Sequence, residues 1–215
     1  MQTAERLAQY LARELDLGER KADSLRFGAE VVFSTVLGLV FIATAGYLSG
    51  CLPEALAAAG ACALVRSFAG GAHCSTVWRC AVVSAAVFPS LGRTAGAIPF
   101  HPGGWELHGV ILAFSGVSVY LILKLAPVDS PSNPIREPIR RRLKRRSLTA
   151  ALVVILALLW LPSSQTPQSI ILAAGLGLLW SALILTSPLH KLMDLADRIM
   201  GFLPERLRKS ASQSV

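Results

Sequence analysis

Residues 31–50 read VVFSTVLGLVFIATAGYLSG, twenty consecutive positions without a charged side chain. A helix of this length rises about 30 Å, which matches the hydrocarbon thickness of a lipid bilayer. Of the 215 residues in the chain, 53% are hydrophobic and only 16% are charged, whereas about a quarter of the residues in a soluble domain are charged. The stretch therefore predicts a membrane-spanning helix in an integral membrane protein.

Further apolar segments follow, separated by short polar stretches. Two of them, 52–65 and 81–92, reach only about 21 Å and 18 Å as helices. The remaining candidates are 108–124, 148–161 and 169–187. We predict an all-α, polytopic membrane helical bundle, a single integral membrane domain over residues 1–215 with six transmembrane helices. In an alternative with four spans, the two short segments form a re-entrant hairpin.

The N-terminal part of the chain is charged and has no continuous apolar core of a signal peptide. Leu7, Leu11 and Leu15 recur at helical spacing, with Arg and Glu between them. This pattern is typical of an amphipathic helix. We expect residues 1–28 to form a cytoplasmic amphipathic helix, either on the membrane surface or as a cap on the bundle.

The basic residues are sorted along the chain. Residues 1–30, 66–80, 124–146 and 188–215 hold 20 of the 21 Lys and Arg residues, and Arg93 is the other one. Because cytoplasmic loops of membrane proteins are enriched in Lys and Arg, these four segments are expected in the cytoplasm, with both termini there. The net charge of +8 then reflects orientation, and no nucleic-acid partner is expected.

The densest basic run lies within the predicted cytoplasmic loop 124–146. It consists of Arg140, Arg141, Arg142, Lys144, Arg145 and Arg146. One interpretation is an anchor on anionic lipid head groups. The other is a docking site for an acidic or amphipathic peptide.

The predicted loop 66–80 reads RSFAGGAHCSTVWRC and carries the candidate chemistry. Cysteine beside histidine is the smallest nucleophile–base pair. Neighbouring residues such as His73 and Cys74 point apart on a helix. His73 and Cys80 share a face but lie about 10.5 Å apart along a straight helix. They can meet only if the chain bends between them, so spacing favours Cys80 weakly.

The same residues give a poor metal site. His73, Cys74 and Cys80 match no recognised zinc spacing, so we expect no metal and no cofactor. Cys62 lies in an alanine-rich segment and is expected to be a small buried hydrophobe. Cys51 has no second cysteine on its predicted side of the membrane, so no disulfide is expected.

Two separate motifs in this order resemble the accessory gene regulator B family. The first is Arg66, Gly70-Gly71, His73 and Cys80, and the second is the segment APVDSPSNPI at 126–135. Members of that family are membrane-embedded cysteine endopeptidases of bacterial quorum sensing. They remove the C-terminal part of a short propeptide and help to form a cyclic thiolactone or lactone signal.

The resemblance implies roles for particular residues. His73 would be the base and Cys80 the nucleophile, with Arg66, Gly70 and Gly71 as supporting residues. It also implies a short amphipathic, AgrD-like propeptide as substrate, a homodimer, and a place in the inner (cytoplasmic) membrane of a bacterial cell. The Ala- and Arg-rich composition departs from the family and leaves the cognate peptide open.

Two other classes of protein fit parts of the pattern. A transporter or channel also contains short, broken membrane segments, although the two halves of this chain show no matching pair of them. A non-catalytic membrane scaffold would use residues 1–28 or the predicted cytoplasmic tail 188–215 to bind a partner. The segment 127–134 likewise has two interpretations, a stiff proline loop or a peptide-handling element.

Overall fold

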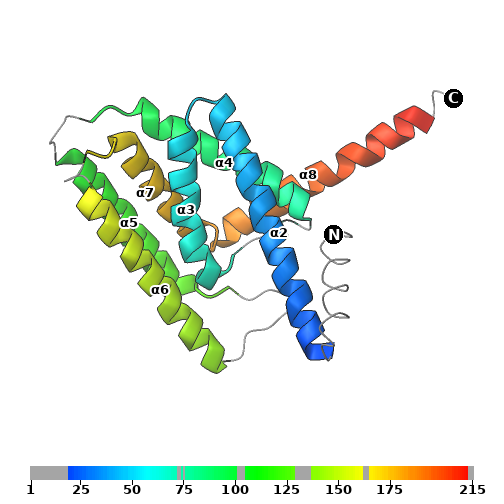
Figure 1. Cartoon of the computed structure of the whole chain (residues 1–215), viewed down its shortest axis with the longest axis horizontal. Coiled ribbons are helices and arrows are strands. Elements are labelled where there is room, and N and C mark those ends of the chain that lie inside the picture. The colour runs from blue at the N-terminus through cyan, green and yellow to red at the C-terminus, as the bar shows by residue number, and fades with distance from the viewer. Residues whose placement is uncertain are drawn as a thin grey trace.

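The computed structural model describes residues 19–71, 74, 76–100, 105–128, 137–161 and 165–212. This part of the chain contains seven α-helices and no strand, so the prediction of an all-α bundle is confirmed. The helices are α2 (Glu19–Leu48), α3 (Leu52–Ala69), α4 (Val77–Ala97), α5 (Glu106–Leu125), α6 (Glu137–Trp160), α7 (Gln168–Leu183) and α8 (Ser187–Ser212), and Figure 1 shows their arrangement.

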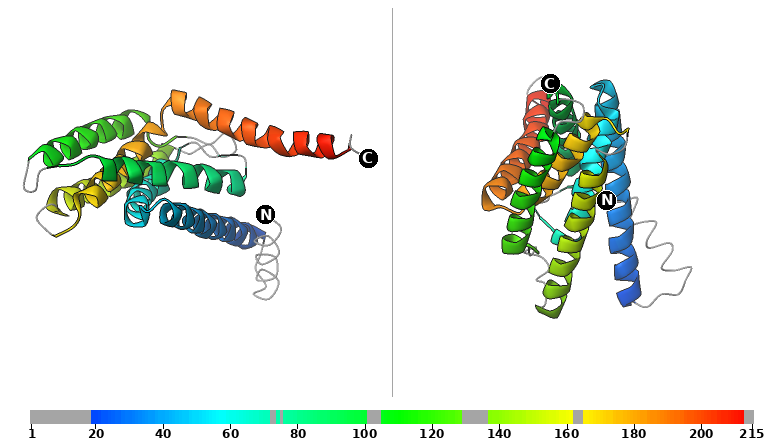
Figure 2. Two further views of the ribbon diagram at one scale, coloured as in Figure 1. Left: turned by 90° about the horizontal axis from the view of Figure 1, so that it is seen from above. Right: turned by 90° about the vertical axis from the view of Figure 1, so that its left-hand side faces the viewer.

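Helices α3 and α7 lie at the centre of the bundle. Helix α3 packs against α7 and also against α2, α4 and α6, while α7 also contacts α4, α5 and α6. Helix α8 leaves the end of α7 and extends beyond the bundle, as Figure 2 shows from two further directions. The two central helices therefore form the scaffold against which the other bundle helices pack.

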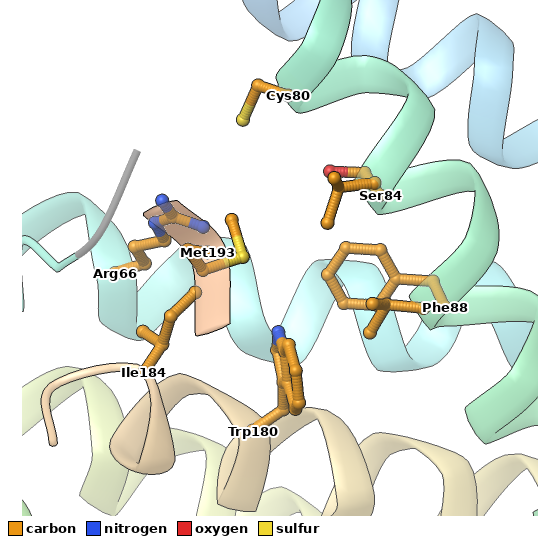
Figure 3. Close-up of a pocket in the computed structure, with 9 residues that line it drawn as sticks. Arg66, Cys80, Ser84, Phe88, Trp180, Ile184 and Met193 are labelled. Atoms are coloured by element: carbon orange, nitrogen blue, oxygen red, sulfur yellow. The ribbon is translucent and has the colours of Figure 1, made fainter. Parts of the chain in front are cut away.

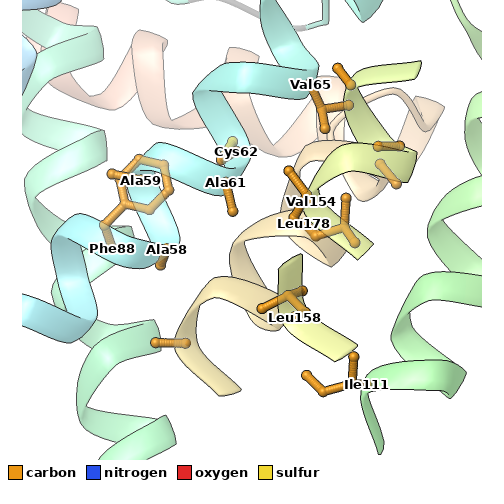
Figure 4. Close-up of a cluster of buried hydrophobic side chains, with 14 of the residues drawn as sticks. Ala58, Ala59, Ala61, Cys62, Val65, Phe88, Ile111, Val154, Leu158 and Leu178 are labelled. Carbon is orange, nitrogen blue, oxygen red and sulfur yellow. The ribbon is translucent and has the colours of Figure 1, made fainter. Parts of the chain in front are cut away.

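Small residues allow the two central helices to approach closely. The buried face of α3 is made largely of alanine, and Ala58 is completely buried. A Cβ added to Gly177 on α7 would collide with the backbone of Ala58. Helices in lipid gain their packing energy from such close backbone contact. Figure 4 shows the larger side chains, such as Val154 and Leu158, that close the core around this pair.

The outer surface is apolar, as lipid exposure requires. On α2 the side chains of Val32, Val36 and Leu39 are all more than half exposed. Within the part of the chain that the structure describes, three helices can cross a membrane by length and composition, or four if the pair of α7 and α8, bent by 93°, counts as one span. The three are Val31–Leu48, Leu52–Ala69 and Glu106–Leu125. The chain is thus a polytopic membrane protein, and six spans stay a prediction.

Helices α3 and α4 are longer than the apolar segments read from the sequence. Helix α3 has 18 residues and α4 has 21, so they extend about 27 Å and 32 Å. The predicted loop 66–80 is therefore wrong at both boundaries, and the connection is 70–76. The charge of Arg66 does not end α3, because a cation in the last turn is favourable to the helix dipole.

Helix α6 corrects a second boundary. It begins at Glu137, so the basic run 140–146 is helical and not part of a loop reaching residue 146. Arg and Lys are good helix formers, so one helix can run through the basic residues and on into the apolar segment that follows them. Residues 19–28 of the expected amphipathic helix form the first part of α2. Residues 1–18 lie outside the described part of the chain. The predicted tail is helical as far as residue 212.

Candidate functional site

The two sequence motifs meet at one end of the bundle, where α3, α5 and α7 all end. The backbone N–H of Val128, which follows α5, donates a hydrogen bond to the carbonyl of Ala69 at 3.1 Å. The side chain of Ile184, which follows α7, lies against Gly71. Residues that are far apart in sequence are thus held at one place, and Asp129–Ile135 of the second motif lie outside the described residues.

Two glycines shape the turn after α3. Gly70 and Gly71 have φ angles of +74° and +127°, a region that side chains with a Cβ rarely adopt. A Cβ on Gly70 would lie 3.1 Å from the Val128 carbonyl oxygen, and one on Gly71 would lie 2.9 Å from Cγ2 of Ile184. Both positions therefore require glycine for conformation and for space.

Cys80 lies in the first turn of α4. The hydroxyl of Thr76, the N-cap residue, accepts a hydrogen bond from the backbone N–H of Arg79 at 3.4 Å. The N–H of Cys80 donates to the Thr76 carbonyl at 3.1 Å. The N-cap therefore fixes the backbone at Cys80 in the first turn of the helix. The first turn of a helix is also a favourable place for negative charge.

A pocket joins Cys80 to Arg66. Figure 3 shows the side chains of Cys80 and Phe88 on α4 facing those of Arg66 and Trp180 across it. The polar groups of Cys80 and Arg66 lie at one end, and the rest of the wall is mostly apolar. The complete lining is Arg66, Cys80, Val83, Ser84, Val87, Phe88, Trp180, Ile184 and Met193.

An ion pair fixes α8 beside the site. A guanidinium nitrogen of Arg79 lies 3.2 Å from the carboxylate of Asp197 and donates to the Asp197 carbonyl at 3.3 Å. This contact joins the first turn of α4 to α8, and Met193, one turn earlier on α8, enters the pocket wall. Sequence reasoning did not find Met193, Asp197 or Trp180. The apolar spacing of residues 189–200 was the available signal for an α8 face that packs on the bundle.

Cys74 is the second thiol near the site and lies close to Cys80. The pKa of the Cys74 thiol is raised to about 11, first by burial and then by the nearby Cys80 and Asp197, against the opposing effect of Arg66 and Arg79. Cys74 is therefore held as a neutral thiol near pH 7, and a neutral thiol is a poor nucleophile.

The remaining predicted groups divide into two sets. Arg66, Cys80 and the two glycines are brought together at this end of the bundle, whereas His73 lies outside the described residues, so its approach to Cys80 stays a prediction. All four cysteines are free thiols. Among the described residues, no three His, Cys, Asp or Glu side chains form a group that could hold a metal ion.

These features define an all-helical membrane protein with a thiol and a guanidinium in the wall of a mostly apolar pocket. The chain belongs to the accessory gene regulator B family, whose model matches residues 4–185. Two relatives from Clostridium perfringens, from the type A strains SM101 and 13, carry names that describe them as AgrB-like. Each is 21% identical over 192 residues, covering 84% of this chain and 88% of the relative.

No solved structure gives a significant match to the chain. Family membership gives the chain a role in the accessory gene regulator system. The matched range ends at residue 185, so α8 and its contribution to the pocket lie beyond it.

Proposed function

We propose that the chain is a membrane-embedded cysteine endopeptidase. It removes the C-terminal part of a short, amphipathic, AgrD-like propeptide and produces a cyclic thiolactone or lactone intermediate for quorum sensing. The observation that carries the proposal is the position of Cys80 in the first turn of α4, in the wall of a pocket that Arg66 also lines. The family motifs converge at the same place.

The first step forms an acyl-enzyme. His73 accepts the proton of the Cys80 thiol, and the sulfur attacks the carbonyl carbon of the scissile peptide bond. The C–N bond then breaks, and the C-terminal fragment leaves as an amine that takes the proton from His73. The N-terminal part stays attached to Cys80 as a thioester. Arg66 favours the thiolate or positions a carboxylate of the substrate.

The second step closes the ring. A thiol or hydroxyl within the bound peptide attacks the thioester carbonyl, and Cys80 leaves as a thiolate that is protonated again. Exchange of one thioester for another is nearly balanced in energy, so removal of the released fragment draws the reaction forward. Excluding water protects the acyl-enzyme from hydrolysis, and the apolar wall of the pocket helps to exclude water.

The proposal includes an arrangement in the cell. The protein is a homodimer in the bacterial cytoplasmic membrane, with both termini and the 70–76 connection on the cytoplasmic side. A membrane-impermeant maleimide should therefore label a single cysteine at position 80 in inverted vesicles. Labelling in intact cells but not in inverted vesicles would contradict this orientation.

The activity is tested by propeptide cleavage with purified variants in lipid. Cys74→Ser should keep most of the activity, because it alters a thiol that is not ionised. Cys80→Ser should abolish cleavage, because a hydroxyl is far less ionised than a thiol near neutral pH. His73→Ala should lose cleavage and still insert. Full turnover by the Cys80→Ser variant would overturn Cys80 as the nucleophile, whereas no cleavage by the wild-type chain would favour a transporter or a scaffold.

A further inference from the structure

We propose that the apolar pocket next to Cys80 is a subsite for one uncharged, apolar side chain of the peptide substrate. Met193 on α8 sets the size of the side chain that it accepts. The inference rests on the proposed function, since the side chain belongs to the residue whose carbonyl Cys80 attacks. Neither the family motifs nor the matched range includes Met193.

The composition of the pocket determines what it can bind. Beyond Cys80 and Arg66, the wall is formed mainly by Phe88, Trp180, Ile184 and Met193. Apart from an acidic group that reaches Arg66, a charged side chain placed there would lose its hydration without gaining a partner. An apolar side chain would instead gain the free energy of leaving water.

The size of the pocket limits the ligand to a single side chain. Its enclosed volume is about 10 Å³, roughly the space of a single water molecule, so a side chain can enter only if part of the wall moves aside. The thiol and the guanidinium in the wall suit a peptide backbone or carboxylate better than the hydrocarbon chain of a lipid. The remainder of the peptide must therefore lie outside the pocket.

Met193 is the adjustable part of the wall. Its side chain is 5% exposed and packs with Ile184, which is 1% exposed. Methionine is unbranched and flexible, so it adapts to a neighbour of a different shape. Helix α8 is held beside the pocket by the ion pair of Arg79 and Asp197, which is only partly buried. Met193 can thus fill the subsite when it is empty and move aside for a ligand.

The test uses acetyl-glycyl-Xaa benzyl thioesters, in which Xaa is Leu, Asn or Phe. Attack by Cys80 at the thioester carbonyl releases benzyl mercaptan and leaves the acyl group on Cys80, so the cognate propeptide is not needed. With the wild-type chain in lipid, the Leu thioester should acylate Cys80 at least about tenfold faster than the similarly sized Asn thioester. Equal rates for Leu and Asn would overturn the subsite.

Two variants identify the residue that sets the size. Met193→Ala should raise the Phe-to-Leu rate ratio by about tenfold or more, because the lost side chain leaves room. Leu192→Ala is the matched control, since Leu192 is the exposed neighbour of Met193 on α8 and should leave the ratio unchanged. An unchanged ratio in Met193→Ala, with normal acylation of Cys80, would overturn the subsite and leave the proposed function intact.

A binding measurement separates the two proposals. Acetyl-glycyl-photoleucine amide is irradiated with the Cys80→Ala variant, and the cross-links are mapped by mass spectrometry. Cross-links to Trp180, Ile184 or Met193 support the subsite even if no thioester acylates Cys80, a result that would refute only the proposed function. Cross-links elsewhere, or capture of a photoactivatable lipid at these residues without the peptide, would refute the subsite.

Discussion

Replacing Gly71 by alanine should slow the acylation of Cys80 by about 5- to 150-fold, although Gly71 is not expected to touch the substrate. The φ angle of +127° costs a residue with a Cβ about 1–3 kcal/mol, and about 1.4 kcal/mol corresponds to a factor of ten in rate. The new Cβ would also lie 2.9 Å from Cγ2 of Ile184, closer than the 3.4–4 Å of ordinary contacts. The 70–76 connection, which carries His73, would therefore leave its native conformation.

The assay is single-turnover acylation by the Leu thioester, with insertion and folding checked by circular dichroism and size exclusion. Gly60→Ala is the matched control, because a Cβ on Gly60 meets nothing within 4 Å. Combining Gly71→Ala with Ile184→Ala should restore the rate only in part, since it removes the contact but not the backbone strain. A wild-type rate for Gly71→Ala would refute the idea that this turn positions the catalytic groups.

Other consequences of the structure can be tested in the same preparation. Gly177→Ala should destabilise the bundle by about 1–3 kcal/mol in detergent-induced unfolding, because the Cβ collides with α3. Gly96→Ala is the control: the space around Gly96 is open, so this variant should not destabilise the bundle by more than a few tenths of a kcal/mol. Asp197→Asn should lower the free energy of unfolding by less than about 1 kcal/mol, since its ion pair is partly exposed. It should speed hydrogen exchange in α8 but not in α3. Exchange in α8 at the wild-type rate would contradict the role of the ion pair. In a variant whose only cysteine is Cys74, burial, the largest cause of the raised pKa, is retained although Cys80 is gone. The rate of maleimide labelling should therefore still rise about tenfold per pH unit through pH 9, and a plateau near pH 9 would show that burial does not raise the pKa of this thiol.

The membrane-spanning character of the chain could be predicted from particular runs of residues. The uncharged stretch at 31–50 requires a span because no charge interrupts it, and the structure has a helix there. The boundaries of α3 and α4 could not be predicted in this way. Arg66 lies in the last turn of α3, where a cation is favourable, and Arg79 lies in the first turn of α4, where Asp197 pairs with it. A charged residue was therefore a poor marker of a loop.

The site was predictable to the extent that it depends on local sequence. The pair Gly70-Gly71 indicated a tight turn, and the positive φ angles agree with it. Met193 could not be found, because the 93° bend between α7 and α8 brings it to the pocket wall that Trp180 of α7 also lines. Such a bend depends on tertiary packing and leaves no periodic signal in the sequence.

The identity of the acylated residue tests the central proposal most directly. The wild-type chain is mixed with the Leu thioester or the propeptide, quenched in acid and digested with trypsin. Cleavage after Arg79 places Cys74 and Cys80 in separate peptides, 67–79 and 80–93. The account predicts the acyl mass on the 80–93 peptide, and its loss in His73→Ala. An acyl group on the 67–79 peptide, or none on either peptide while the propeptide is still cleaved, would contradict the account.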